Sequence, residues 1–261
     1  MRRSKTLEKL RAGQTVMCLK NTFVNADIVE MMGYIGIDVC WICNEHLGIN
    51  PENLKNIIRA GRAADIDVMV RRPFGYYDDM IQPLEMGAAG LMIPHCASAE
   101  MAREVVKAAK FHPIGKRGVD GVSGDSYFGS TTGVEYMETA NRETFIMAQI
   151  EDAEAIDQID AIGAVEGIDI LFVGPADLSH SLGVPNQFKH PKVQDAICKI
   201  IEAARKYNKW CGTPGLDDEY TVDLIRRGVN FITFGGDYGA LRQNFTQRRD
   251  RFQELLAEAK K

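Results

Sequence analysis

Two carboxylates follow two neighbouring apolar runs within residues 145–178. Glu151 comes directly after the run FIMAQI, and Asp177 follows the run DILFVG across a Gly-Pro-Ala turn. The amphipathic segment DAEAIDQIDAIGAV lies between the runs, so this order predicts the strand, helix and strand of one parallel βαβ unit. Ligands of parallel α/β folds bind beyond the carboxyl ends of the strands, and adjacent strands lie about 4.8 Å apart. We therefore expect Glu151 and Asp177 to be able to share one small cation.

Carboxylate oxygens are hard ligands that suit Mg²⁺ or Mn²⁺ with open, water-filled positions. A 2-oxo acid could fill two of those positions, and the cation would then polarise the carbonyl group and stabilise an enolate. The residues alone leave a second interpretation open. In it, both carboxylates are helix N-caps, and Asp177, which precedes Leu178 and Ser179, could cap a short helix.

Further polar side chains follow other apolar runs. Arg71 ends the run DVMVR and could neutralise an oxyanion or a carboxylate because it is always charged, or it could form a salt bridge at the rim. His46 follows the run DVCWIC and could move protons near neutral pH, directly or through a water, or it could be structural. We expect Arg72, His95 and Cys96 to support these residues or to pack.

Two alternative chemistries have little support. A Schiff-base lyase needs a lysine in the site, and Lys20 is the candidate at the end of a predicted strand, but nothing near it in sequence indicates a lowered pKa. Cys40 and Cys43 form a C-x-x-C motif, but the motif lies inside a strand-like run rather than at the start of a helix, which disfavours a redox role.

The elements that must position these residues alternate along the chain. Eight apolar runs are separated by amphipathic segments, and they are TVMCLK (15–20), DVCWIC (38–43), DVMVR (67–71), GLMIPH (90–95), FIMAQI (145–150), DILFVG (169–174), KWCGTP (209–214) and FITFGG (231–236). This pattern predicts a single α/β domain, residues 1–261, folded as a parallel (β/α)₈ barrel with a final amphipathic helix at about 238–259. An open doubly wound sheet is the alternative. Its dinucleotide-binding version is disfavoured, because no G-x-G-x-x-G follows the first predicted strand. The Gly-rich loop 112–134 is long enough to be a functional lid or an interface element.

Composition narrows the function classes. The chain has 261 residues, 45% of them hydrophobic, which suits one (β/α)₈ barrel, although two smaller domains are possible by length. A net charge of −5 argues against general nucleic-acid binding. We expect no membrane association, because no apolar run is long enough to span a bilayer and no apolar N-terminal targeting region is present. Six cysteines in or beside apolar runs suit reduced thiols in a cytoplasmic protein.

Seven segments in the same order resemble one family, the metal-dependent (class II) pyruvate aldolases, which includes 4-hydroxy-2-oxoheptanedioate aldolase and 2-dehydro-3-deoxyglucarate aldolase. The segments are NEHLGIN (44–50), VRRPFG (70–75), LEMGAAGLMIPH (84–95), GKRGVDG (115–121), QIED (149–152), VEGIDILFVGPADLSHSLG (165–183) and FITFGGDYGAL (231–241). They span nearly the whole chain, and the GPADLS-S-LG pattern is highly specific.

The resemblance implies a (β/α)₈ barrel, often a homo-oligomer, specifically a hexamer whose last helix is exchanged between subunits. It implies that Glu151 and Asp177 hold a divalent metal ion (Mg²⁺, Mn²⁺ or Co²⁺). It implies that Arg71 stabilises the pyruvate enolate and that His46 works in acid–base chemistry with an acidic partner, for which the matching position is Glu85. The residues implied in seating pyruvate are Gln149, Gly174, Pro175 and Ala176.

Four features depart from the usual family pattern. The family commonly has Asp-Gly-Glu-His after the second strand, where this chain has a thiol, Cys43, in place of the Asp. The acid that pairs with the histidine is usually Asp, and here it is Glu85, one methylene longer. Pro214 replaces a common aliphatic residue, and the loop 120–140 is unlike that of the commonest members. We therefore expect an intact enolate site with an altered acceptor pocket and proton relay.

These observations predict a carbon–carbon lyase that reversibly cleaves a 4-hydroxy-2-oxo acid into pyruvate and an aldehyde, both small molecules. Two alternatives stay open on the sequence. The first keeps the enolate but breaks a different bond, as a decarboxylase of oxaloacetate-like acids. The second is a non-catalytic relative that binds 2-oxo acids, which the thiol at Cys43 makes conceivable.

Overall fold

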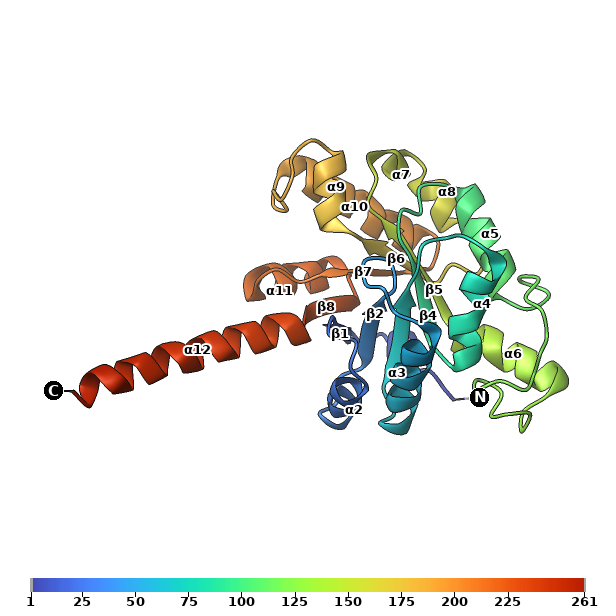
Figure 1. Cartoon of the computed structure of the whole chain (residues 1–261). Coiled ribbons are helices and arrows are strands. Elements are labelled where there is room, and N and C mark those ends of the chain that lie inside the picture. Colours follow the sequence, from blue (N-terminus) through green and yellow to red (C-terminus); the bar gives the residue numbers. More distant parts are fainter. Residues whose placement is uncertain (1, 261) are drawn as a thin grey trace.

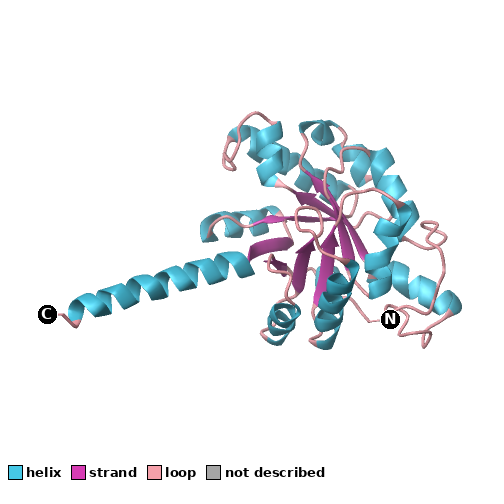
Figure 2. Ribbon diagram, in the orientation of Figure 1, coloured by secondary structure: helices cyan, strands magenta, loops and turns pink. Residues whose placement is uncertain are grey.

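The structure, a computed structural model, describes residues 2–260 and contains one closed barrel of eight parallel strands in sequence order (Figures 1 and 2). The strands are β1 (Val16–Asn21), β2 (Val39–Cys43), β3 (Asp67–Arg71), β4 (Gly90–Ile93), β5 (Phe145–Ile150), β6 (Ile170–Val173), β7 (Trp210–Pro214) and β8 (Phe231–Gly236). The pairing of β8 with β1 closes the sheet, which confirms the predicted (β/α)₈ barrel over the open doubly wound alternative.

Helices surround the barrel (Figure 2). They are α1 (Lys5–Arg11), α2 (Ala26–Tyr34), α3 (Pro51–Ala63), α4 (Tyr77–Met86), α5 (Ala99–Ala109), α6 (Gly133–Glu143), α7 (Ala153–Asp157), α8 (Ile159–Gly163), α9 (Pro175–Ser181), α10 (Pro191–Lys206), α11 (Asp218–Arg227) and α12 (Asp237–Glu258). Ser98 caps the start of α5, because its hydroxyl accepts from the Met101 N–H. Among the described helices, none is long and apolar enough to cross a bilayer.

Two apolar layers form the core because strand side chains alternate between the inside and the outside of the barrel. Val39, Trp41 and Met69 belong to the cluster inside the barrel, whereas Cys40 and Val68 belong to the cluster between the strands and the helices. Both sides of most strands are therefore buried, with β1 and β8 partly exposed, which explains why the runs are largely apolar. The inward positions at the carboxyl ends of the strands are polar, and they are Lys20, Cys43, Arg71 and Gln149.

Two segments differ from the sequence prediction. The segment DAEAIDQIDAIGAV forms two short helices, because Gln158 leaves the helical conformation between α7 and α8, while Ile156 and Ile159 stay buried on either side of the break. The helix α6 was not predicted. Its residues are mostly polar, and it is held largely by the buried Tyr136 and Ala140, with the Tyr136 ring 5.3 Å from that of Phe111.

The C-terminal helix α12 is present, and it points away from the barrel instead of packing beside β8 (Figure 1). Phe245, Phe252, Leu255 and Leu256 are exposed along it. A cavity of about 630 Å³ lies where α2, β1, β8 and the start of α12 meet, and Met17, Ile28, Met31, Ile35 and Phe234 are among its apolar lining residues. The outer face of β8, with part of that of β1, is thus left without a helical cover.

Candidate active site

The carboxylate of Glu151 is buried and held from three sides at the end of β5. Glu151 is only 1% exposed, and one of its carboxylate oxygens accepts a hydrogen bond from the His95 backbone N–H at 2.9 Å. The other oxygen accepts from the Gln149 side-chain amide. Gly174 lies against the same carboxylate so closely that a Cβ at this position would overlap it. The end of β5 and the turn after β6 therefore fix Glu151 in one orientation.

Asp177 is exposed in the first turn of α9, which begins directly after β6. The helix cap is Gly174, and Pro175 occupies the first helical position, so the interpretation of Asp177 as the helix cap is wrong. The Asp177 carboxylate is close enough to affect Glu151. Burial raises the pKa of Glu151 to about 7, and the negative charge of Asp177 adds to this rise, although the His95 N–H and imidazole oppose it.

This arrangement fits a hard divalent cation. A buried carboxylate beside a second carboxylate is costly unless a positive charge compensates it. The side-chain oxygen of Gln149 is also buried with no hydrogen-bond partner. Within residues 2–260 no group of three or more His, Cys, Asp or Glu side chains converges as a metal site. The protein would thus supply two charged ligands, and water and substrate would supply the others, as is common for Mg²⁺ sites.

Arg71 lies in the barrel mouth at the end of β3 and is 5% exposed. Its Nε lies 3.0 Å from Glu45 Oε2, one terminal nitrogen donates to Cys43 Sγ at 3.0 Å, and the guanidinium stacks 4.9 Å from the centre of the Trp41 ring. The pairing of β2 with β3 places Cys43 directly beside Arg71. Arg71 does form an ion pair, but the pair is buried in the mouth and is not an exposed rim salt bridge.

The thiol of Cys43 is fully buried and has an unusual environment for a cysteine. Burial opposes ionisation, but hydrogen bonds from the His46 backbone N–H and from Arg71 outweigh it and lower the pKa of Cys43. All six cysteines are free, and Cys40 faces the outer layer whereas Cys43 faces the barrel. The C-x-x-C motif is therefore not a paired redox site.

Glu45 links both histidines to Arg71. Its Oε2 lies 3.6 Å from His46 Nε2, and its Oε1 lies 3.9 Å from His95 Nε2. His46 is largely exposed, at 63% of its side chain. From the sequence alone, Glu45 had no predicted role, although its place between Asn44 and His46, just after β2, was a signal.

His95 does more than pack. It adopts a left-handed backbone conformation, with φ of 50°, which turns its N–H toward Glu151. Its Nδ1 lies 3.1 Å from Asp152 Oδ2. Burial lowers the pKa of His95, but the Asp152 contact and the charges of Glu151 and Glu45 outweigh this effect and raise it overall. The expected supporting role is seen in the backbone contact, and the imidazole itself is half exposed at the site.

Glu85 lies outside this group in its own chain. It is near the end of α4, its carboxylate is 3.9 Å from Arg117, and burial raises its pKa. Its backbone carbonyl accepts from the Asp125 N–H at 3.1 Å. Pro83 lies inside α4 without ending it, so it does not redirect Glu85 toward His46.

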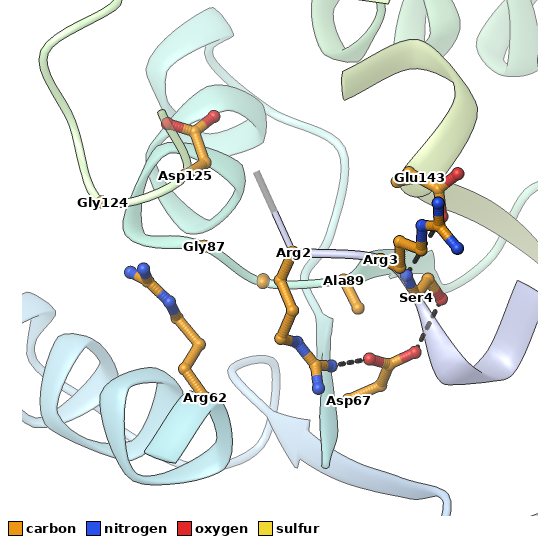
Figure 3. Close-up of a pocket in the computed structure, with 11 residues that line it drawn as sticks. Arg2, Arg3, Ser4, Arg62, Asp67, Gly87, Ala89, Gly124, Asp125 and Glu143 are labelled. Atoms are coloured by element: carbon orange, nitrogen blue, oxygen red, sulfur yellow. Dashed lines mark hydrogen bonds and ion pairs between the residues drawn. The ribbon is translucent and has the colours of Figure 1, made fainter. Parts of the chain in front are cut away.

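A small cavity lies at the opposite, amino-terminal end of the barrel (Figure 3). Asp67, the first residue of β3, accepts from the Ser4 hydroxyl at 2.6 Å and pairs with Arg2. Glu143 accepts from the Ser4 N–H at 3.1 Å. These contacts tie the N-terminal segment to the barrel, so this end has a structural role, as is usual for the amino-terminal face of a (β/α)₈ barrel.

The chain is similar to several known proteins over most of its length. Residues 44–243 match the family model described as HpcH/HpaI aldolase/citrate lyase. A hydroxypyruvate/pyruvate aldolase from Sagittula stellata is 33% identical over 92% of this chain and 94% of its own. A 2-keto-3-deoxy-L-rhamnonate aldolase from Klebsiella pneumoniae is 33% identical over 95% of this chain and 93% of its own.

Solved structures agree with these relatives. The crystal structure of an HpcH/HpaI aldolase from Desulfitobacterium hafniense is 33% identical, covers 95% of this chain and 96% of its own, and superposes with a TM-score of 0.86. The structure of citrate synthase SbnG is 30% identical, covers 95% of this chain and 97% of its own, and has a TM-score of 0.87.

Proposed function

This chain belongs to the HpcH/HpaI aldolase/citrate lyase family, and from that premise we propose that it is a metal-dependent pyruvate aldolase. It cleaves a 4-hydroxy-2-oxo acid reversibly into pyruvate and an aldehyde. The observation that carries the proposal is the buried Glu151 carboxylate, fixed close to Asp177 at the carboxyl ends of the strands, where Arg71 is also buried at the end of β3.

Glu151 and Asp177 are the proposed ligands of a divalent metal ion, with Mg²⁺, Mn²⁺ and Co²⁺ as the candidates. The metal supplies one piece of chemistry, which is polarisation of the carbonyl group of the 2-oxo acid. The unpartnered oxygen of Gln149 supports a role in seating the substrate, together with the backbone of Gly174, Pro175 and Ala176. Because Gly174 has no side chain, substrate can approach the turn closely.

The other residues act on charge and protons. A base, which we take to be a water held by His46, removes the proton of the 4-hydroxyl group. The C3–C4 bond then breaks, an aldehyde carbonyl forms at C4, and the electron pair moves toward the C2 carbonyl to give the enolate of pyruvate. Arg71 stabilises the negative charge on the enolate oxygen. Protonation at C3 gives pyruvate.

Glu85 is proposed as the acidic partner of His46, supplied by a neighbouring subunit. In its own chain Glu85 pairs with Arg117, so it could reach a histidine only across an interface. Mixing the two inactive variants Glu85→Gln and Glu151→Gln, with subunit exchange confirmed, should restore activity in sites formed from one intact half of each. No recovery would mean that Glu85 does not act across subunits.

A homo-oligomer, a hexamer by resemblance, is the proposed state of the protein. The uncovered outer face of β8 and the apolar cavity beside it support this proposal, because the exposed apolar side chains of α12 could fill such a cavity in another copy. Light scattering on wild-type protein and on Phe252→Asp should show a loss of assembly in the variant. The unpaired cysteines support a cytoplasmic location.

The proposed function is tested by a turnover screen. Pyruvate is incubated with a panel of aldehydes and with Mg²⁺, Mn²⁺ or Co²⁺, and each reaction is repeated with a chelator. We expect aldol products that disappear with the chelator and return when metal is added. Oxaloacetate is included as a substrate, and decarboxylation without any aldol product would favour the decarboxylase instead. No reaction of either kind would favour the non-catalytic relative.

A further inference from the structure

Lys20 ends β1 inside the barrel mouth, beside the residues assigned above. Val16 and Cys18 belong to the inner cluster, and side chains alternate along a strand, so Lys20 faces the same side. Its ammonium lies 5.0 Å from the centre of the Trp41 ring, and the guanidinium of Arg71 lies 4.9 Å from that ring. Two cations therefore share one aromatic side chain at the mouth.

The charges of these two cations are balanced differently. Arg71 has the Glu45 carboxylate 3.0 Å away. The Lys20 ammonium makes neither an ion pair nor a hydrogen bond with any other residue in the part of the chain that the structure describes. It is also half-buried, so water compensates it only in part. An anionic group on a bound substrate would therefore stabilise the Lys20 ammonium.

The end of β1 is a rigid support for Lys20. The buried Asp237 carboxylate accepts from the Asn21 side chain and from the backbone N–H groups of Thr22 and Phe23, at 3.1, 2.7 and 3.0 Å. The pairing of β1 with β8 is irregular next to Lys20, and Gly236 lies so close to the Lys20 carbonyl that a Cβ there would overlap it. Irregular pairing of this kind commonly redirects a side chain next to a site.

The position of β1 shows which end of a substrate Lys20 would meet. In a closed barrel of eight strands in sequence order, β1 lies opposite β5, and His46 follows β2, next to β1. A substrate whose 2-oxo acid is held at the ends of β5 and β6, and whose C4 hydroxyl lies near His46, has its remaining atoms directed toward β1. The far end of the aldehyde portion therefore meets Lys20.

We propose that Lys20 determines specificity by binding an anionic group at the far end of the aldehyde, so that the preferred aldehyde carries a carboxylate or a phosphate. The inference rests on the proposed aldolase function and narrows its substrate class. A lysine that only packs on Trp41 would support neutral and anionic aldehydes equally. The two roles therefore predict different ratios of kcat/KM for anionic over neutral aldehydes, and not only different overall rates.

The test compares matched aldehydes that differ in charge. Succinic semialdehyde is paired with butanal for the carboxylate, and glyceraldehyde 3-phosphate is paired with glyceraldehyde for the phosphate. For each pair, kcat/KM in the aldol direction is measured for wild type, Lys20→Met, Lys20→Arg and Lys206→Met. Lys206→Met is the matched control, because it removes a lysine charge on the exposed surface, where Lys206 pairs with Asp160 at 2.9 Å.

We expect wild type to prefer the anionic member of at least one pair. The pair with the larger preference shows whether Lys20 binds a carboxylate or a phosphate. Lys20→Met should lower that preference about tenfold or more, mainly through KM, since a lost charge-assisted contact is typically worth about 1.5–3 kcal/mol. Lys20→Arg should keep most of the preference, and Lys206→Met should keep all of it. An equal loss for both members of each pair would overturn the inference and show a packing role.

The failure of this inference is distinguishable from failure of the proposed function. If wild type condenses pyruvate with neutral and anionic aldehydes in a metal-dependent reaction but without any preference, Lys20 is not a specificity residue and the aldolase assignment stands. If wild type condenses pyruvate with none of the four aldehydes, both the assignment and the inference are overturned.

Discussion

Metal affinity should depend on pH through Glu151. Burial and the neighbouring Asp177 raise the pKa of Glu151 from 4.5 to about 7. A carboxylate must lose its proton before it binds a cation. With a pKa near 7, about one eleventh of the protein is ionised at Glu151 at about pH 6, and about ten elevenths at about pH 8. Affinity for Mn²⁺ should therefore fall about tenfold between these two pH values, or about 1.4 kcal/mol.

The same shift predicts how the metal-free protein responds to pH. Because the pKa of Glu151 is higher in the folded than in the unfolded protein, the folded state binds the proton more tightly. The contribution of Glu151 to the stability of the metal-free protein is therefore most favourable below about pH 4.5. This contribution is lost as the pH rises through about 7. With the pKa of Glu151 raised from 4.5 to about 7, the difference in stability is about 3 kcal/mol, and a bound cation should recover part of it.

The assay is titration calorimetry with Mn²⁺ at about pH 6, 7 and 8, in two buffers of different protonation enthalpy, so that released protons are counted. Proton release should approach one per metal at low pH. Glu151→Gln should bind poorly at every pH, whereas Asp160→Asn, which changes an exposed carboxylate paired with Lys206, should behave like wild type. A wild-type affinity that does not change across this range, without proton release, would refute the assignment of Glu151 as the titrating ligand.

Three further changes test other parts of the site. Arg71→Ala should lower kcat about 100-fold or more, because it removes the donor to the enolate oxygen, and steady-state kinetics with unchanged kcat would leave Arg71 a structural ion-pair partner. Cys43→Asp places a carboxylate beside Arg71 and should raise or alter aldol activity; a lower melting temperature with unchanged activity would mean that Cys43 only packs. Gly174→Ala should weaken Mn²⁺ binding about tenfold or more, since its methyl group overlaps the Glu151 carboxylate, and calorimetry with wild-type affinity would contradict that geometry.

The barrel was predictable because most of its strands are buried on both sides. Such strands read as short apolar runs, and their alternation with amphipathic segments indicates parallel pairing. The position of Glu151 directly after such a run was enough to place its carboxylate at the barrel mouth. The helix α6 was not predictable in this way, because only Tyr136 and Ala140 hold much of it to the core and the rest of its surface is polar.

The contacts of Arg71 depend on strand register, which the sequence does not state. Cys43 lies beside Arg71 because β2 and β3 pair with these residues opposite each other. Glu45 joins them only because the loop after β2 turns back over the mouth, where its carboxylate reaches both Arg71 and His46. The residues at the strand ends were therefore predictable from the sequence, but Glu45, the acid that connects them, was not. It also could not place Glu85, whose proposed role requires a second copy of the chain.

The exchange of pyruvate methyl protons with solvent tests the central claim most directly, because it needs the enolate site but no aldehyde. Pyruvate is incubated with the protein in deuterated buffer, and the methyl signal is followed by NMR. The reaction is measured with Mg²⁺ or Co²⁺ and no Mn²⁺, then with a chelator, and then with the Glu151→Gln variant. We expect exchange that requires both the metal and Glu151. Exchange that continues at the same rate with the chelator, or in Glu151→Gln, would contradict it.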